Sequence, residues 1–237
     1  MPRSSSRSNR ATDPNTLPLS FEQLVTQYID FLETAIHTLL YVRQVYPSEL
    51  FLRRQRWGVV VQMARHEGVR AWVGKSLEVI GKQLIEGNAR TVVLIFMSAE
   101  GFPSERWLFQ FDDVDQISKS SDERRKTDPI RKPNAPTKST LEPVFRRLLL
   151  QMIATGGALS PLNLSDESTH APFTLLLEDP APGPHPSDDD LTPALERFTS
   201  NSIGQRIREG ELKQTTLALS EIENGVLDME IVVQTLQ

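Results

Sequence analysis

The chain has 237 residues, a length that suits one domain with irregular ends or two small domains. Acidic residues outnumber basic ones by 31 to 26, and the formal net charge of -5 argues against broad electrostatic binding to nucleic acid or to an anionic membrane. Cysteine is absent, which excludes a disulfide scaffold, a thiol nucleophile and a cysteine-ligated zinc, and suits a reducing compartment such as the nucleus or the cytoplasm.

Residues 1–19 are rich in serine and arginine and are predicted to form a disordered tail, because they lack the apolar stripe of a mitochondrial presequence. Order is expected to begin at Ser20, since Ser20 and Gln23 have the spacing of a capping box. A helix over residues 21–42 follows. Its wide apolar stripe predicts a central, buried helix, and the charges within it argue against a membrane span.

The next elements are predicted to be a strand and a second helix. The basic run over residues 53–56 is expected to form a turn before a strand over residues 59–63. Apolar residues recur at helical spacing from Val69 to Leu84, and Gly87 is expected to stop that helix.

Two strands, over residues 91–97 and 107–111, are predicted to pair as a hairpin across a turn of glycine and proline. Residues 116–139 change to serine, lysine, arginine, aspartate and proline, with scarcely an apolar residue. This composition predicts a flexible surface insertion within the domain.

A third helix is predicted over residues 141–153, with capping-box spacing at residues 139 and 142 and the glycine pair 156–157 as its end. A strand over residues 173–177 and one or two late strands within residues 217–233 complete the chain. Three helices interleaved with strands and hairpins indicate an α+β fold, with the helices packed on one face of a mostly antiparallel sheet.

The motifs that could carry catalysis are incomplete. Gly74-Lys75-Ser76 resembles the end of a phosphate-binding loop, but it lies inside a helical stripe, where the backbone N–H groups are already bonded. His66-Glu67 begins a metalloprotease pattern, but Arg70 stands where the second histidine is required. Asp188–Asp190 lack the spaced ligands of a calcium loop. The sequence therefore predicts a binding or scaffolding protein, not an enzyme, with no cofactor and no metal.

Two segments carry a family resemblance. Residues 31–47, which read FLETAIHTLLYVRQVYP, and residues 56–63, which read RWGVVVQM, resemble the HORMA-domain family. Within that family the likeness is to the regulatory subunits of translesion DNA polymerase zeta, with Trp57 where relatives usually carry tyrosine. It covers most of residues 20–178 and returns at residues 226–233. The checkpoint branch of the family is the alternative, since it shares the wording of residues 46–49.

The resemblance implies a mechanism of partner capture. HORMA proteins trap an extended segment of a partner against a sheet edge and close a C-terminal safety belt over it. By this resemblance the HORMA domain spans residues 20–237 and the belt about 179–237. The receiving edge is Phe173, Leu175 and Leu177, and the terminal belt strand contains Val226, Leu227, Met229, Ile231 and Val233.

The resemblance also places Tyr46 and Trp57 near the captured segment, which in this subfamily contains proline. An equally supported interpretation is that Trp57 belongs to the hydrophobic core.

The implied partner is the catalytic subunit of DNA polymerase zeta, with the protein as an accessory subunit in translesion synthesis and damage tolerance. The alternative is a spindle-checkpoint protein that binds a checkpoint activator. A second surface, at Thr216, Glu230 and Val232, corresponds to the site for a translesion deoxycytidyl transferase scaffold, although these residues differ in character from those of animals.

Further implied partners are a second HORMA domain and a remodelling AAA+ ATPase. Arg146 and Arg147 on the third helix are the residues expected at a dimer interface, with simple exposure to water as the alternative. No direct contact with nucleic acid or membrane is expected, and the expected location is the nucleus and the cytoplasm.

Overall fold

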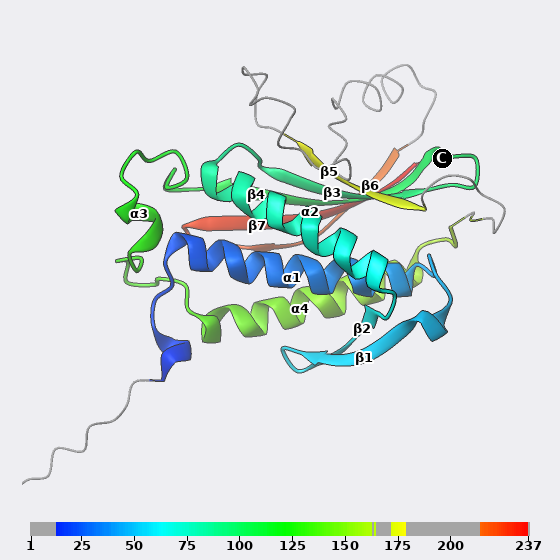
Figure 1. Cartoon of the computed structure of the whole chain (residues 1–237), viewed down its shortest axis with the longest axis horizontal. Coiled ribbons are helices and arrows are strands. Elements are labelled where there is room, and N and C mark those ends of the chain that lie inside the picture. The colour runs from blue at the N-terminus through cyan, green and yellow to red at the C-terminus, as the bar shows by residue number, and fades with distance from the viewer. Residues whose placement is uncertain (1–12, 163, 165–171, 179–213, 237) are drawn as a thin grey trace, which may run out of the picture.

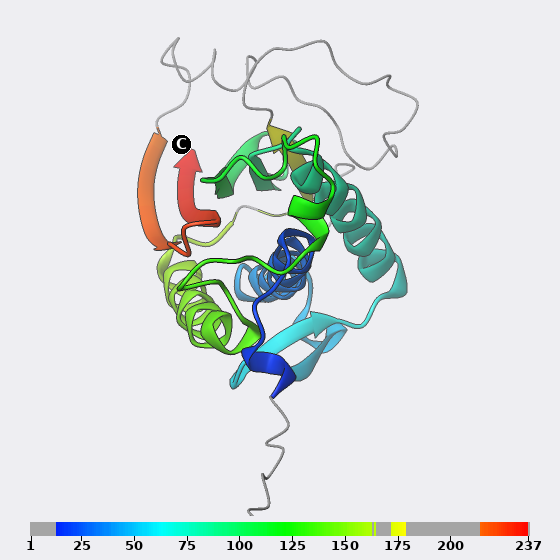
Figure 2. The same cartoon turned by 90° about the vertical axis from the view of Figure 1, so that its left-hand side faces the viewer.

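The computed structural model describes residues 13–162, 164, 172–178 and 214–236. A five-stranded antiparallel sheet carries the helices on one face, and a separate two-stranded hairpin lies on the other side of those helices (Figure 1). The view turned by 90° shows the same order of layers, with the sheet and the hairpin on opposite sides of the helices (Figure 2). The α+β prediction, with helices on a mostly antiparallel sheet, is confirmed.

Helix α1, Phe21–Val42, runs through the middle of the domain (Figure 2). The predicted capping box is present: the Gln23 backbone N–H donates to Ser20 Oγ at 3.2 Å, and the Ser20 N–H donates to Gln23 Oε1 at 3.0 Å. Buried side chains occur on nearly every side of α1, which explains why its apolar stripe is wider than that of a surface helix. None of the helices in the described ranges is long and apolar enough to cross a membrane.

Helix α2, Glu67–Glu86, ends as predicted at Gly87, whose φ of 73° is the left-handed conformation that glycine adopts without strain. The N-cap of helix α4, Lys138–Ala158, lies two residues earlier than predicted, at Thr137 and not at Ser139. The helix also continues through the two glycines that were expected to end it. Gly156 allows close packing there, since a Cβ at that position would lie 3.0 Å from Cγ1 of Val42.

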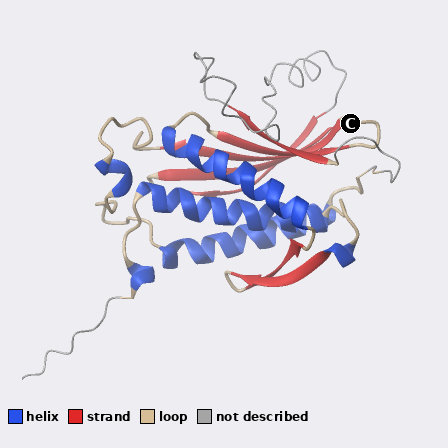
Figure 3. Ribbon diagram, viewed as in Figure 1, coloured by secondary structure: helices blue, strands red, loops and turns tan. Residues whose placement is uncertain are grey.

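The sheet is formed by β5 (Phe173–Glu178), β3 (Thr91–Met97), β4 (Pro103–Asp113), β7 (Leu227–Leu236) and β6 (Gln214–Ile222), in that spatial order. The hairpin of β3 and β4 is as predicted. All neighbouring strands are antiparallel, and β5 and β6 are the two edges. Figure 3 shows the helices gathered on one side of this sheet.

The prediction of a basic turn was wrong. Residues 51–56 form strand β1 (Phe51–Arg56), which pairs with β2 (Val59–Ala64), and the turn lies at Trp57 and Gly58, both with positive φ. Strand β1 follows the short 3-10 helix η2 (Ser48–Leu50). Arginines dominate β1 because its last four residues are exposed, so no apolar alternation reveals the strand.

Residues 116–139 pack more than their composition suggests. Ile117 and Ile130 are buried, and the single-turn helix α3 (Arg124–Thr127) lies between them. Lys132 forms a 2.6 Å ion pair with Asp115 and donates to the Gly225 carbonyl at 2.6 Å. The flexibility of this segment stays a prediction, but its few apolar side chains belong to the core.

The start of the chain also differs from the sequence-based expectation. Residues 1–12 lie outside the described part, whereas residues 13–19 have a defined path that includes the 3-10 helix η1 (Pro14–Thr16). Leu19 is buried, and its N–H donates to the Pro136 carbonyl at 2.9 Å. The last part of the predicted tail is therefore packed against the chain that leads into α4.

Candidate functional site

Strand β5 offers an open sheet edge. In the described part of the chain its one strand partner is β3. The carbonyl of Pro172 accepts from Met97 N–H at 3.0 Å, and that of Glu178 accepts from Arg90 N–H at 3.2 Å, so both point toward β3. Because backbone groups alternate in direction along an antiparallel strand, those of Phe173, Leu175 and Leu177 point the other way. These backbone groups can bind an added strand.

The side chains of the same residues have a different role from their backbone. Phe173 and Leu175 are buried against the helices, with exposed fractions of 7% and 0%, and Leu177 packs partly against the same core. A partner strand would therefore contact the backbone of the predicted receiving edge, while the side chains hold β5 in place.

Two aromatic side chains flank the start of β5. The ring of Phe173 lies 5.1 Å from that of Trp72 and 6.3 Å from that of Tyr46, each at an interplanar angle of 87°. Tyr46 is half-buried, and this burial raises the pKa of its phenol. Sequence reasoning found Tyr46 and Phe173 but missed Trp72, which lies on α2 beside the predicted apolar stripe.

A cavity of about 780 Å³ opens beside this aromatic group. Its walls come from the end of α1, the loop after it, the end of β3, the last turns of α4 and the residue before β5; they include Tyr41, Gln44, Tyr46, Met97, Ile153 and Pro172. The cavity is large enough for one or more side chains of an extended segment. Because Pro172 lines it, the cavity lies at the Phe173 end of β5.

Trp57 lies elsewhere. Its ring contacts Phe145 at 5.0 Å and Phe31 at 6.1 Å, and its carbonyl accepts from Arg146 Nε at 2.7 Å. Trp57 forms the turn of the β1–β2 hairpin together with Gly58, and this hairpin packs on the side of the helices away from the sheet (Figure 1). The structure therefore does not bring Trp57 to Tyr46 and Phe173, and it supports the core interpretation of this tryptophan.

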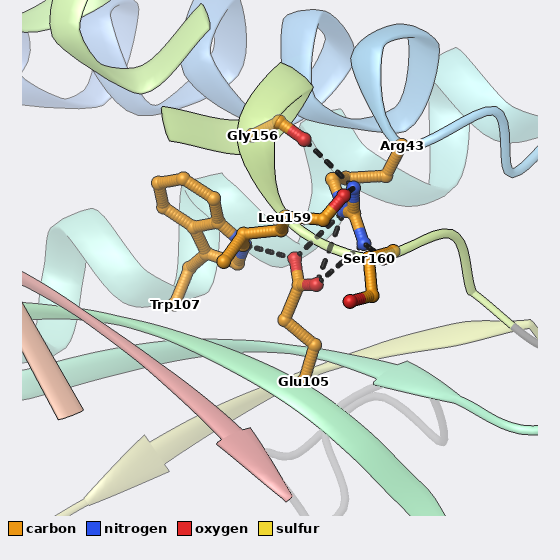
Figure 4. Close-up of polar contacts among 6 residues, drawn as sticks. All are labelled: Arg43, Glu105, Trp107, Gly156, Leu159 and Ser160. Carbon is orange, nitrogen blue, oxygen red and sulfur yellow. Dashed lines mark hydrogen bonds and ion pairs between the residues drawn. The ribbon is translucent and has the colours of Figure 1, made fainter. Parts of the chain in front are cut away.

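A buried ion pair fixes the chain next to the cavity (Figure 4). Arg43, the last cap of α1, lies 2.8 Å from Glu105 of β4, and both side chains are almost completely buried. The guanidinium also donates to the carbonyls of Gly156, Leu159 and Ser160 at the end of α4. Arg43 thus joins α1, α4 and the sheet at the start of the loop that follows α1 and contains Tyr46.

Glu105 is further bound by the indole of Trp107, whose Nε1 donates to Oε1 at 2.6 Å (Figure 4). Burial raises the pKa of the Glu105 carboxyl, and the hydrogen bond from Trp107 and the charge of Arg43 oppose that effect. The carboxylate accepts from both partners, which is the arrangement that a buried charge requires. Sequence reasoning missed this pair, which no local pattern marks.

The terminal strand docks on the edge of β4, away from β5. Strand β7 pairs with β4 from Thr235 to Leu227, and β6 pairs with the outer side of β7. The predicted belt-strand side chains are all buried: Val226, Leu227, Met229, Ile231 and Val233. They act as core residues of the sheet. Residues 179–213, the rest of the predicted belt, lie outside the described residues.

The residues predicted for a second partner lie on the face of the sheet away from the helices. Thr216 and Glu230 are exposed, whereas Val232 is 8% exposed and packs with Leu108 and Leu176 in a small apolar cluster. The predicted dimer residues on α4 are exposed, and both form hydrogen bonds within the chain. Arg146 donates to the Trp57 carbonyl, and Arg147 Nη2 donates to the Glu221 carbonyl at 3.2 Å. The structure brings neither set to β5.

Comparison with known proteins identifies related sequences. The model of the HORMA domain family matches residues 25–188. A zebrafish (Danio rerio) protein named mitotic spindle assembly checkpoint protein MAD2B is 40% identical over 106 residues, which are 44% of this chain and 50% of that protein. An Arabidopsis thaliana DNA polymerase zeta processivity subunit is 34% identical over 82 residues, 35% of this chain and 38% of that protein. The chain thus spans half the length of the zebrafish protein, or less for the plant one.

Solved structures share the fold. A chain of a mitotic checkpoint complex superposes with a TM-score of 0.63 at 19% identity, covering 90% of this chain and 98% of that one. The Caenorhabditis elegans protein HTP-2, bound to the HIM-3 closure motif, gives a TM-score of 0.60 at 11% identity, with 95% and 98% covered. At these identities the likeness establishes the architecture alone.

Proposed function

The chain belongs to the HORMA domain family, and from this premise we propose that it is an adaptor that captures an extended segment of a partner protein on the open edge of β5. The observation that carries the proposal is the outward direction of the backbone groups of Phe173, Leu175 and Leu177 at an edge that no other described strand covers. The C-terminal hairpin lies on the opposite side of the sheet, so no strand in the described ranges pairs with the outer edge of β5.

Strand addition explains how such an edge binds. The partner's backbone pairs with the outward N–H and C=O groups, which supplies affinity with little dependence on sequence. Selectivity then comes from side chains that enter the adjacent cavity of about 780 Å³, where Tyr46 offers an aromatic face. A proline ring suits this surface because it is apolar and loses little conformational entropy on binding.

The partner we propose is a proline-containing segment of the catalytic subunit of DNA polymerase zeta. Support comes from the names of relatives in Arabidopsis thaliana and Schizosaccharomyces pombe, both called DNA polymerase zeta processivity subunit. In this role the protein is a non-catalytic accessory subunit in translesion synthesis and damage tolerance. Residues 179–213 then belong to a safety belt that slows release of the segment. The proposed location is the nucleus and the cytoplasm.

A second candidate is a spindle-checkpoint adaptor that binds a checkpoint activator. The relatives named MAD2B and the likeness to a chain of a mitotic checkpoint complex favour it. Binding of the protein to peptides from the two candidate partners, measured side by side, distinguishes the two functions. Contacts with a deoxycytidyl transferase scaffold, a second HORMA domain and an AAA+ ATPase stay proposals that concern other surfaces.

The test of the adaptor function removes one edge donor. Replacing Leu177→Pro deletes an outward N–H, whereas Leu177→Ala shortens the same partly buried side chain and keeps that donor. We expect Leu177→Pro to weaken binding of a fluorescent polymerase zeta peptide by about tenfold or more, and Leu177→Ala to bind nearly as the unmodified protein does. Equal affinities of the two variants would contradict strand addition at β5.

A further inference from the structure

Gln44 has a backbone conformation that glycine adopts most easily. It follows Arg43, the cap of α1, with a φ of 54°. Its N–H donates to the Tyr41 carbonyl and the next N–H, of Val45, donates to the Leu40 carbonyl, both at 3.0 Å. This is the Schellman arrangement, in which the left-handed residue is usually glycine because a side chain there is strained.

The fold requires this turn but not a glutamine. On one side Arg43 is held by Glu105, and on the other Val45 enters the core with 8% of its surface exposed, so the chain must reverse direction between them. The side chain of Gln44 is exposed and forms no hydrogen bond with the described part of the chain. Glycine at this position would give the same turn with less strain.

The side chain of Gln44 has a place in the candidate site. It lines the cavity of about 780 Å³ together with Tyr46 and Pro172, next to the point where β5 begins. A strand added to β5 loses its hydrogen-bond partners once it passes Phe173 and runs over this cavity. A carboxamide has both donors and an acceptor, so it can replace β5 as a partner for one peptide unit.

We propose that Gln44 is a further binding residue of this site, which binds a backbone peptide unit of the captured segment beyond the Phe173 end of β5. The proposal rests on the adaptor function proposed above. It explains why a strained backbone position carries a long polar side chain. That side chain makes no hydrogen bond with the described residues, and a bound partner would supply one.

The chain offers a matched control. Gln116 is a second exposed glutamine with positive φ, 50°, and it does not line this cavity. Three variants, Gln44→Gly, Gln44→Ala and Gln116→Gly, are compared with the unmodified protein. The probe is a fluorescein-labelled synthetic peptide copied from the proline-containing segment of the polymerase zeta catalytic subunit, with a scrambled peptide of the same composition as reference.

Both glycine variants are expected to melt at a higher temperature than the unmodified protein, because each relieves a left-handed side-chain position. Gln44→Gly and Gln44→Ala are expected to weaken peptide binding about tenfold, the effect of one or two lost hydrogen bonds. Gln116→Gly is expected to bind as the unmodified protein does. The opposite signs of stability and affinity in Gln44→Gly separate a binding role from a structural one.

Unchanged affinity in both Gln44 variants would overturn the proposal. So would normal binding by Gln44→Ala with weak binding by Gln44→Gly, since the loss would then come from backbone flexibility. If the unmodified protein binds the labelled peptide no better than the scrambled one, the adaptor function itself fails for this partner and the Gln44 role falls with it. Failure of the Gln44 proposal alone looks different: the unmodified protein then binds the labelled peptide specifically, and the Gln44 variants bind it equally well.

Discussion

Arg106 on β4 forms a 2.9 Å ion pair with Glu178 at the end of β5, and its other terminal nitrogen donates to Gln234 of β7 at 3.3 Å. One guanidinium thus links the candidate receiving strand to the docked C-terminal hairpin. The pair lies on the face of the sheet away from the helices, and the exposed fractions of the two side chains are 11% and 23%. The edge strand β5 is therefore joined to β7 through a single partly buried side chain.

Replacing Arg106→Gln should lower the free energy of unfolding by about 1–3 kcal/mol, because the Glu178 carboxylate loses a charged partner. Amide hydrogen exchange should increase in β5 and β7 and stay unchanged in α2. Lys82→Gln removes an exposed ion pair with Glu78 and serves as control, with an expected effect below about 0.5 kcal/mol. Equal effects of the two variants would show that the Arg106 contacts do not join the strands.

Arg43 holds a buried carboxylate, so its removal should be far more costly. We expect Arg43→Met to lower the free energy of unfolding by about 3–5 kcal/mol in urea titrations, because Glu105 then stays buried without its cation. The double variant Arg43→Met, Glu105→Gln should recover part of that loss, because it leaves no unpaired charge. A double variant less stable than Arg43→Met would contradict this account of the network.

The burial of His37 predicts that the stability of the domain depends on pH. The side chain is fully buried, and neither ring nitrogen has a hydrogen-bond partner among the described residues. Burial, aided by the charge of Arg70, lowers its pKa from 6.5 to about 4. Between these values the unfolded chain binds the proton that the folded one does not. Stability should therefore fall as the pH decreases from 6.5 toward 4, by up to about 3 kcal/mol.

The variant His37→Leu tests this assignment. It replaces the titrating imidazole with an apolar side chain of similar volume. The histidine's contribution to the pH dependence of stability between pH 6.5 and 4 should therefore disappear. His66, which caps α2 on the surface, serves as control in the variant His66→Asn. Urea unfolding at several pH values measures both. A slope that is unchanged in His37→Leu would assign the acid sensitivity to other groups.

The terminal hairpin should be part of the core. Ile231 of β7 is fully buried, whereas Leu217 of β6, on the same hairpin, is 46% exposed. Ile231→Ala should cost about 2–5 kcal/mol, and Leu217→Ala less than about 0.5 kcal/mol, in thermal or urea unfolding. Deleting residues 222–237 should then unfold the domain, which makes that truncation unsuitable as a test of the belt. A truncated protein that melts like the full-length one would contradict the core role of β7.

The sequence predicted those parts of the fold that local patterns determine. The capping box at Ser20, the glycine stop at Gly87 and the strand at Phe173 each depend on residues within a few positions of one another. The misread basic run 53–56 shows the limit of such patterns. Its side chains are exposed on both faces of the strand, so periodicity carried no signal.

The candidate site was predicted less completely because it depends on long-range contacts. Arg43 and Glu105 are separated by 62 positions, and no sequence pattern joins them. Trp72 on α2 contacts Phe173 on β5 although about a hundred positions separate them in the sequence. The resemblance placed Trp57 at the site, whereas its ring contacts Phe31 and Phe145. Strand order, too, follows from pairing between distant segments.

The most direct test of capture on β5 is a scan of the partner peptide by N-methylation of its backbone, one residue at a time. Methylation removes one N–H donor and leaves the side chains of the peptide unchanged. A segment paired with the outward groups of Phe173, Leu175 and Leu177 faces β5 with every second residue. We expect binding to fall about tenfold or more at alternate positions and little at those between them. A loss that ignores this alternation, or none at any position, would contradict strand addition as the mode of binding.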